Sequence, residues 1–326
     1  MAQHEIARRT LLAAGLGALL VRPACAASAI VSENGGLDGV VASDARVETR
    51  FEGGRWCEGP VWVPRLASLV FSDVRANRMM RLPSEGRAVT FRDPSANANG
   101  NAIDAQGRLI TCEHLHRRVV RQEPDGRVTV MADRFAGKPL NSPNDLVVAR
   151  DGAIWFTDPT WGIENPEEGR PSEPEQKGRF VFRLDSSGRL DVVSDSFEQP
   201  NGLAFSPDER VLYVSESSGA GTPEGKREIR AFDVAGGRLS RERVFAMLQS
   251  GAPDGLKCDE AGRVYAGTDG GARIWGPDGT YLGRIATPGD CANIAFGGPD
   301  GRRLYLCSGP AVHAVQLKVR GAGLRS

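Results

Sequence analysis

The chain has 326 residues, 40 % of them hydrophobic, and its 40 glycines and 20 prolines predict a turn-rich globular protein with a large core. Its 41 basic residues cancel its 41 acidic residues, which disfavours nucleic acid or an anionic membrane surface as a partner. We therefore expect a small-molecule partner.

The first 26 residues have the pattern of a cleavable export signal. Arg8-Arg9 precedes an apolar stretch from Leu11 to Val21, and Ala24-Cys25-Ala26 is suited to signal peptidase. The stretch is shorter than the ~20 residues that span a bilayer, so we expect no membrane anchor in the mature protein. The arginine pair resembles a twin-arginine signal, and the ordinary secretory route is the alternative. We expect residues 27–326 to form one domain in the periplasm.

Cleavage would leave five cysteines, and no C-x-x-C spacing among them predicts zinc or redox chemistry. Most of these cysteines stand inside apolar strand patterns. We interpret them as small core residues, with room for one disulfide. They are Cys57, Cys112, Cys258, Cys291 and Cys307.

Six copies of one motif follow along the chain. Each copy has a polar leading residue and a short apolar run, and five of them reach a turn at the same spacing. The copies begin at Glu58, Asn99, Asn144, Asn201, Asp254 and Asn293. A second strand follows each copy, and most copies then show a third. Short strands that repeat at roughly 40 to 55 residues predict an all-β fold, a six-bladed β-propeller.

The segment from Glu164 to Lys177 interrupts this pattern with polar residues, glutamates and prolines. It predicts a loop over one face of the propeller. Either a solvated connector or a lid over a site is compatible with its composition.

The leading residues of the six copies should converge, because the first strand of every blade lines the central channel and starts at one rim. The set consists of two carboxylates and four carboxamides. Such oxygen donors suit a divalent cation, most simply calcium, and the lack of His and Cys disfavours zinc or copper. The alternative is that Asn and Asp only turn the backbone before each strand, which does not explain Glu58.

The second strand of each blade returns to the same rim, so we expect its last residue to face the same cavity. These residues are Asp73, Glu113, Asp158, Glu216, Thr268 and Ser308. Nearby, His114 could bond a ligand or relay a proton, and Trp161 could stack on a ring-shaped ligand.

Four segments together resemble the gluconolactonase family that includes senescence marker protein (regucalcin). They are Trp56-Cys-Glu58-Gly-Pro-Val-Trp, Ser142-Pro-Asn144-Asp, Pro200-Asn201-Gly-Leu-Ala-Phe-Ser-Pro-Asp and Pro253-Asp254-Gly, and the likeness spans about Val47 to Val319. It implies a six-bladed propeller that holds a divalent cation, usually calcium, and hydrolyses sugar lactones.

The resemblance also implies roles for individual residues. Glu58, Asn201 and Asp254 would bind the metal, Asn144 would contact metal or substrate, and Asp254 would be the acid/base residue. The segment Cys112-Glu113-His114 is similar to one common in bacterial gluconolactonases. Ser142 departs from regucalcin-like members, which carry arginine there.

Hydrolysis of a cyclic ester needs a polarised carbonyl, an activated water and a proton for the leaving oxygen. We expect Asp254 to move that proton. The substrate would be surrounded by side chains of the same rim, namely Asn99, Glu113, His114, Asn144, Asp158 and Trp161. A metal-dependent phosphotriesterase or aryl-lactonase and a non-catalytic calcium-binding module are the alternatives.

Overall fold

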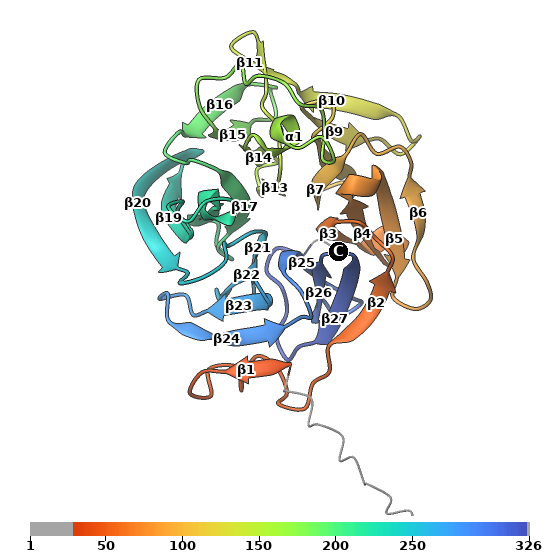
Figure 1. Cartoon of the computed structure of the whole chain (residues 1–326), viewed down its shortest axis with the longest axis vertical. Coiled ribbons are helices and arrows are strands. Elements are labelled where there is room, and N and C mark those ends of the chain that lie inside the picture. Colours follow the sequence, from red (N-terminus) through yellow and green to blue (C-terminus); the bar gives the residue numbers. More distant parts are fainter. Residues whose placement is uncertain (1–28, 325–326) are drawn as a thin grey trace, which may run out of the picture.

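The computed structural model describes residues 29–324, and the predicted export signal lies outside them. Regular structure in this part of the chain is almost entirely β, and the α-helix α1 (Trp161–Glu164) has only 4 residues. No helix among the described residues is long and apolar enough to cross a membrane. Six sheets of four or five strands surround one axis (Figure 1), which confirms the predicted six-bladed β-propeller.

Each blade is an antiparallel sheet whose strands follow one another outward from the axis. The first three blades consist of β3 (Cys57–Val63), β4 (Ser68–Asp73), β5 (Arg78–Pro83) and β6 (Val89–Arg92); of β7 (Ala98–Ile103), β8 (Leu109–Glu113), β9 (Arg118–Gln122) and β10 (Val128–Ala132); and of β13 (Leu146–Val148), β14 (Ile154–Asp158), β15 (Phe180–Leu184) and β16 (Leu190–Ser194). A small ribbon, β11 (Arg134–Phe135) with β12 (Lys138–Pro139), connects the second blade to the third.

The last three blades are built in the same order. They consist of β17 (Pro200–Phe205), β18 (Val211–Glu216), β19 (Glu228–Ala235) and β20 (Arg238–Met247); of β21 (Leu256–Cys258), β22 (Val264–Thr268), β23 (Gly271–Trp275) and β24 (Tyr281–Ala286); and of β25 (Cys291–Gly297), β26 (Arg303–Ser308) and β27 (Ala311–Gln316).

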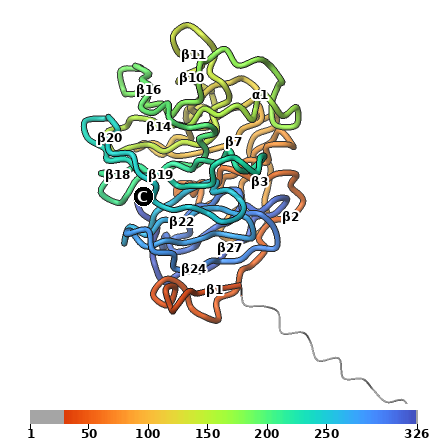
Figure 2. Tube along the Cα trace, turned by 60° about the vertical axis from the view of Figure 1, so that its left-hand side comes forward, coloured from red at the N-terminus to blue at the C-terminus, as the bar shows by residue number. Residues whose placement is uncertain are grey.

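The N-terminal part of the described chain completes the last two blades. β2 (Glu48–Glu52) pairs with β27, with Glu48 opposite Ala314, so the sixth blade combines strands from both ends of the chain. β1 (Ile30–Ser32) adds a fifth strand outside β24. Figure 2 shows both segments, in red and orange, lying against the blue C-terminal blades. Backbone pairing between distant parts of the sequence thus closes the ring.

Apolar side chains fill the spaces between neighbouring blades. Between the second and third blades, Ile110, Phe156 and Phe182 belong to one buried cluster, and the two phenylalanine rings stack with centroids 5.2 Å apart. The five cysteines of the described chain are all buried and free. They therefore pack as small core residues, as their apolar surroundings predict.

Glycine follows the leading residue in four of the six motifs because the inner strands approach one another closely there. A Cβ on Gly202 would lie 2.2 Å from the backbone oxygen of Asp254, and one on Gly255 would lie 2.0 Å from Oδ1 of Asn293. The Gly255 N–H donates to the backbone oxygen of Ala292 at 2.8 Å, which links the fifth blade to the sixth. These glycines allow the inner strands of neighbouring blades to pack closely around the channel.

Gly255→Ala is expected to lower the free energy of unfolding by about 1–3 kcal/mol, because the added methyl group overpacks a rigid contact. Urea denaturation followed by circular dichroism measures the change. Gly39→Ala is the matched control, since a Cβ there would meet nothing within 4 Å. Equal stabilities for the two variants would contradict close packing at Gly255.

Candidate functional site

A cavity of about 830 Å³ opens at the end of the channel where the inner strands begin. Five of the six leading residues line it: Glu58, Asn99, Asn144, Asn201 and Asp254. β3, β7 and β17 each begin one residue before their ring residue, and β13 and β21 begin two residues after theirs. The repeat therefore brings five oxygen-bearing side chains from five blades to one place.

Asn293, the sixth leading residue, lies outside the cavity lining and corrects the expectation of a six-membered ring. Its Nδ2 donates to Oδ2 of Asp145 at 3.3 Å, and its Oδ1 accepts the Ile294 N–H at 2.8 Å. It also forms a hydrogen bond with Glu58. Asn293 therefore orients the carboxylates of Glu58 and Asp145 without lining the cavity itself.

Negative charge is concentrated at the floor of this cavity. Burial, with a smaller contribution from Asp145, raises the pKa of Glu58 to about 8, although the Gly59 N–H bonds the carboxylate at 2.7 Å. Burial also raises the pKa of Asp254 well above its usual value, and Glu58 and Asp145 raise it further. Asp254 itself is partly exposed, because it faces the cavity. Among the described residues, neither Glu58 nor Asp254 forms an ion pair with a basic side chain, and a bound cation would stabilise their charged forms.

The donor set fits a hard divalent cation. The Asn99 side chain is buried, and its Oδ1 has no hydrogen-bond partner among the described residues. No three His, Cys, Asp or Glu side chains of residues 29–324 form a metal-binding group by themselves. A cation would therefore depend on carboxamide oxygens together with two carboxylates, which is the mixed oxygen coordination that calcium accepts.

His114 does not line the cavity, which corrects the expectation that it faces a ligand. Its ring is fully buried behind Asn99, with Nε2 3.4 Å from Asn99 Nδ2, and Gly162 of α1 packs against its side chain. Burial lowers the pKa of His114 to about 4, so the imidazole is neutral near pH 7. Its role in this arrangement is to support Asn99.

The carboxylates at the ends of second strands also turn away from the cavity. Asp73 Oδ1 accepts the N–H groups of Arg55 at 2.8 Å and Trp56 at 3.0 Å, just before Glu58. Asp158 Oδ2 accepts the Asn141 N–H at 2.8 Å, three residues before Asn144. The Asp158 carboxylate therefore binds the backbone of its own blade and does not line the cavity.

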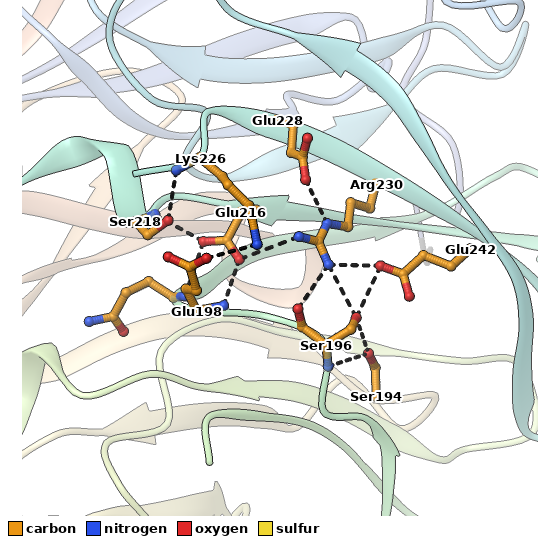
Figure 3. A network of polar contacts seen from close by, with 10 residues as sticks. Ser194, Ser196, Glu198, Glu216, Ser218, Lys226, Glu228, Arg230 and Glu242 are labelled. Carbon is orange, nitrogen blue, oxygen red and sulfur yellow. Dashed lines mark hydrogen bonds and ion pairs between the residues drawn. The ribbon is translucent and has the colours of Figure 1, made fainter. Parts of the chain in front are cut away.

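Glu216 repeats this arrangement in the fourth blade (Figure 3). Its carboxylate accepts the N–H groups of Glu198 at 2.7 Å and Gln199 at 3.0 Å, which lie three and two residues before Asn201. Arg230 lies 3.9 Å from this carboxylate and also pairs with Glu228 and Glu242. The segment before an inner strand carries backbone N–H groups that need acceptors. The carboxylate at the end of the second strand of the same blade accepts their hydrogen bonds.

Glu113 is the remaining predicted contact that the structure places elsewhere. It forms an ion pair with Arg118 of its own blade at 2.6 Å and another with Arg92, the last residue of the first blade, at 3.0 Å. Its carboxylate is buried and outside the cavity lining. Of the six strand-end residues, only Thr268 lines the cavity. The four carboxylates among the others are held by backbone N–H groups or by arginines.

Trp161 does line the cavity, at the start of α1, as expected. Ser142, the departure noted in the sequence, is buried beneath it: its Oγ donates to Pro159 O at 2.7 Å and accepts the Gly162 N–H at 3.0 Å. Ser142 therefore anchors α1, and the loop that follows α1 forms part of the cavity wall.

The loop from Glu164 to Lys177 contributes Glu164, Asn165, Pro166 and Glu168 to the cavity lining. Glu168 pairs with Arg75 at 2.7 Å, and Glu175 pairs with Arg117 at 2.5 Å. Arg75 in turn stacks over the Trp56 ring, 4.5 Å from its centroid. The loop is therefore held at the mouth of the cavity by ion pairs to the first two blades.

Sequence reasoning missed Asp145, Arg75 and Glu168. Asp145 is buried beside the ring, with Oδ1 accepting the Leu146 N–H at 2.8 Å. It occupies the position that is glycine in four other repeats. A carboxylate in place of glycine is the feature of the sequence that could have indicated a role for Asp145. Arg75 and Glu168 lie outside the repeated motif, so the repeat could not have indicated them.

Comparison with known proteins agrees with this architecture. A family model described as "SMP-30/Gluconolactonase/LRE-like region" matches residues 56–309. A gluconolactonase from Zymomonas mobilis is 33 % identical over 312 residues, covering 87 % of this chain and 85 % of its own length. A pentonolactonase from Haloferax volcanii is 30 % identical over 258 residues, covering 76 % and 80 %. A solved gluconolactonase structure from Xanthomonas campestris is 39 % identical, with a TM-score of 0.83 and coverage of 88 % and 94 %.

Proposed function

The chain belongs to the SMP-30/gluconolactonase/LRE-like family, and on that basis we propose that it is an enzyme that hydrolyses a sugar lactone to the aldonic acid. The observation that carries the proposal is the cavity itself, where five oxygen-bearing side chains from five blades converge, two of them carboxylates with raised pKa values. Relatives named gluconolactonase and pentonolactonase support the reaction class.

Glu58, Asn144, Asn201 and Asp254 would hold a divalent cation, with calcium as our proposal. When bound, such a cation supplies Lewis acidity toward a carbonyl oxygen and acidifies a water. Asp254 would accept the proton of the attacking water at its carboxylate and donate it to the ring oxygen that leaves. Asn201 forms a hydrogen bond with Asp254, which lowers the pKa of that carboxyl and favours the form that accepts a proton.

The rest of the lining suits a polyhydroxylated ring. Trp161 offers an aromatic face, against which a sugar ring can pack. Asn99 and Glu168, which both line the cavity, offer hydrogen-bonding groups for the hydroxyl groups of a sugar. The neutral His114 behind Asn99 fixes the orientation of that carboxamide.

A metal-dependent phosphotriesterase or aryl-lactonase would use the same ring of oxygen donors. Its substrates carry apolar groups, whereas this lining is rich in carboxylates and carboxamides, including Glu164, Asn165, Asp269 and Asp290. A non-catalytic calcium-binding module needs no proton-transfer residue, yet Asp254 combines a raised pKa with exposure to the cavity. Both observations favour a lactone hydrolase for sugar lactones.

The deciding experiment titrates calcium into chelated protein and follows both the melting temperature and the hydrolysis of glucono-1,5-lactone. We expect the two to rise together as the site fills. A rise in melting temperature without hydrolysis of any aldonolactone would support a binding module. Hydrolysis that is unaffected by exhaustive chelation would contradict metal dependence and leave the lactonase assignment intact.

We also propose that the chain is exported to the periplasm, on the pattern of residues 1–26. Export should yield a mature chain that begins near Ala27. Replacement of Arg8-Arg9 by two lysines should retain the uncleaved chain in the cytoplasm if the twin-arginine route is used. Cell fractionation with N-terminal sequencing measures both, and normal cleavage of the variant would indicate the ordinary secretory route.

A further inference from the structure

The opposite end of the central channel holds a second, chemically different pocket of about 410 Å³. All six inner strands contribute to it, and most of the side chains they present are apolar. These include Trp62, Ile103, Leu146, Leu203, Phe205 and Phe296. The pocket shares none of its lining residues with the polar cavity described above. It is therefore a separate site on the same axis.

Most polar side chains in this second lining are already satisfied within the protein. The amino group of Asn101 donates to the backbone oxygen of Gly59 in the neighbouring inner strand, and its carbonyl accepts the Thr111 hydroxyl of its own blade. Ser206 donates to Asp208 at 2.6 Å. Glu209 accepts the backbone N–H of Arg150 at 3.0 Å and lies 3.7 Å from its guanidinium. These groups have little capacity left for a ligand.

Lys257 differs from them. Its Nζ donates to the backbone oxygen of Leu256 at 2.9 Å, and none of the ion pairs between described residues includes it. An ammonium group has three donors, so two remain for a partner. The positive charge of Lys257 lowers the pKa of the buried Asp145 carboxyl, although burial raises that pKa overall. Lys257 thus places a positive charge that has no direct ion pair among the described residues in the wall of an apolar pocket.

We propose that this second pocket binds a small monocarboxylate with an apolar body. The carboxylate would take the free donors of Lys257, and the body would pack against the aliphatic and aromatic walls. Pockets of this size that combine apolar walls with one charged group commonly hold small ligands in this way. An aldonic acid does not fit this description, because its hydroxyl groups would be buried without partners.

Isothermal titration of the whole protein with octanoate tests the proposal. We expect saturable binding of octanoate, and binding at least about tenfold weaker for octan-1-ol, which lacks the charge, and for acetate, which lacks the body. Lys257→Met keeps the length of the side chain and should weaken octanoate by about 10- to 100-fold while leaving octan-1-ol unchanged. Unchanged binding of octan-1-ol also shows that the variant is folded.

Two further arms locate the binding. Lys257→Arg keeps the charge and should retain most of the affinity for octanoate. Excess gluconate should leave octanoate binding unchanged, since the two pockets are separate. The proposal is overturned if wild-type protein does not bind octanoate, if Lys257→Met binds it as tightly as the wild type, or if gluconate displaces it.

Discussion

Asp254→Asn is expected to reduce the turnover of glucono-1,5-lactone by about 10²- to 10⁴-fold at saturating calcium. The amide keeps an oxygen toward the cavity and the shape of the side chain, so the protein should still fold and bind the cation, although more weakly. It cannot accept a proton from water. The loss should therefore fall on kcat, measured by the pH change or a coupled assay of acid release at several calcium concentrations.

Asp290→Asn is the matched control for this variant. Asp290 lines the same cavity but is exposed and is not one of the ring of oxygen donors. The same chemical change there should leave most of the turnover intact. If Asp254→Asn keeps its turnover, the base is a different group. Glu58 or Glu168 would then be the next candidate, because Asp158 and His114 do not reach the cavity.

The leading residues of the motif could be predicted from the sequence because their position depends on the backbone alone. Every inner strand begins at the same rim, so equal spacing from residue to turn places Asn144, Asn201 and Asp254 around one axis. The motif also places a glycine next to most of them, where neighbouring strands nearly touch. A repeat of this kind fixes both the fold and the floor of the site.

The ends of the second strands could not be predicted in the same way. Their backbone does return to the same rim, but the direction of each side chain depends on which backbone N–H groups lack a partner nearby. Asp73, Asp158 and Glu216 all turn back toward such groups in their own blades. The spacing of residues along the sequence does not show which backbone N–H groups will lack a hydrogen-bond acceptor in the folded blade.

The mouth of the cavity depends on a segment outside the repeat. Composition shows that residues 164–177 are polar, but their position follows from ion pairs such as Arg75 with Glu168, whose members are 93 positions apart. Pairings at that separation follow from the folded ring and not from any local pattern. This explains why the sequence left the loop equally compatible with a connector and a cover.

Glu58→Gln is expected to weaken calcium binding at pH 8 by at least about 10- to 100-fold, a loss that occurs even when residues that only orient metal ligands are changed. The substitution removes one of two carboxylates that line the cavity floor, and it preserves an oxygen and the size of the side chain. Glu164→Gln, at the exposed rim of the same cavity, is the control and should bind calcium like the wild type.

The pH dependence of calcium binding tests the same carboxylate a second time. Burial raises the pKa of Glu58 to about 8, so without a cation the group is mostly protonated at pH 6 to 7. Calcium must displace that proton, so the contribution of Glu58 to the wild-type affinity should rise with pH and level off above about 8. Glutamine carries no such proton, so the affinity of Glu58→Gln should rise less steeply, with Asp254 alone responsible for the remaining slope. Calorimetry at pH 6, 7 and 8 in buffers of different ionisation enthalpy counts the protons released, and equal proton release by both proteins would show that Glu58 does not bind the ion.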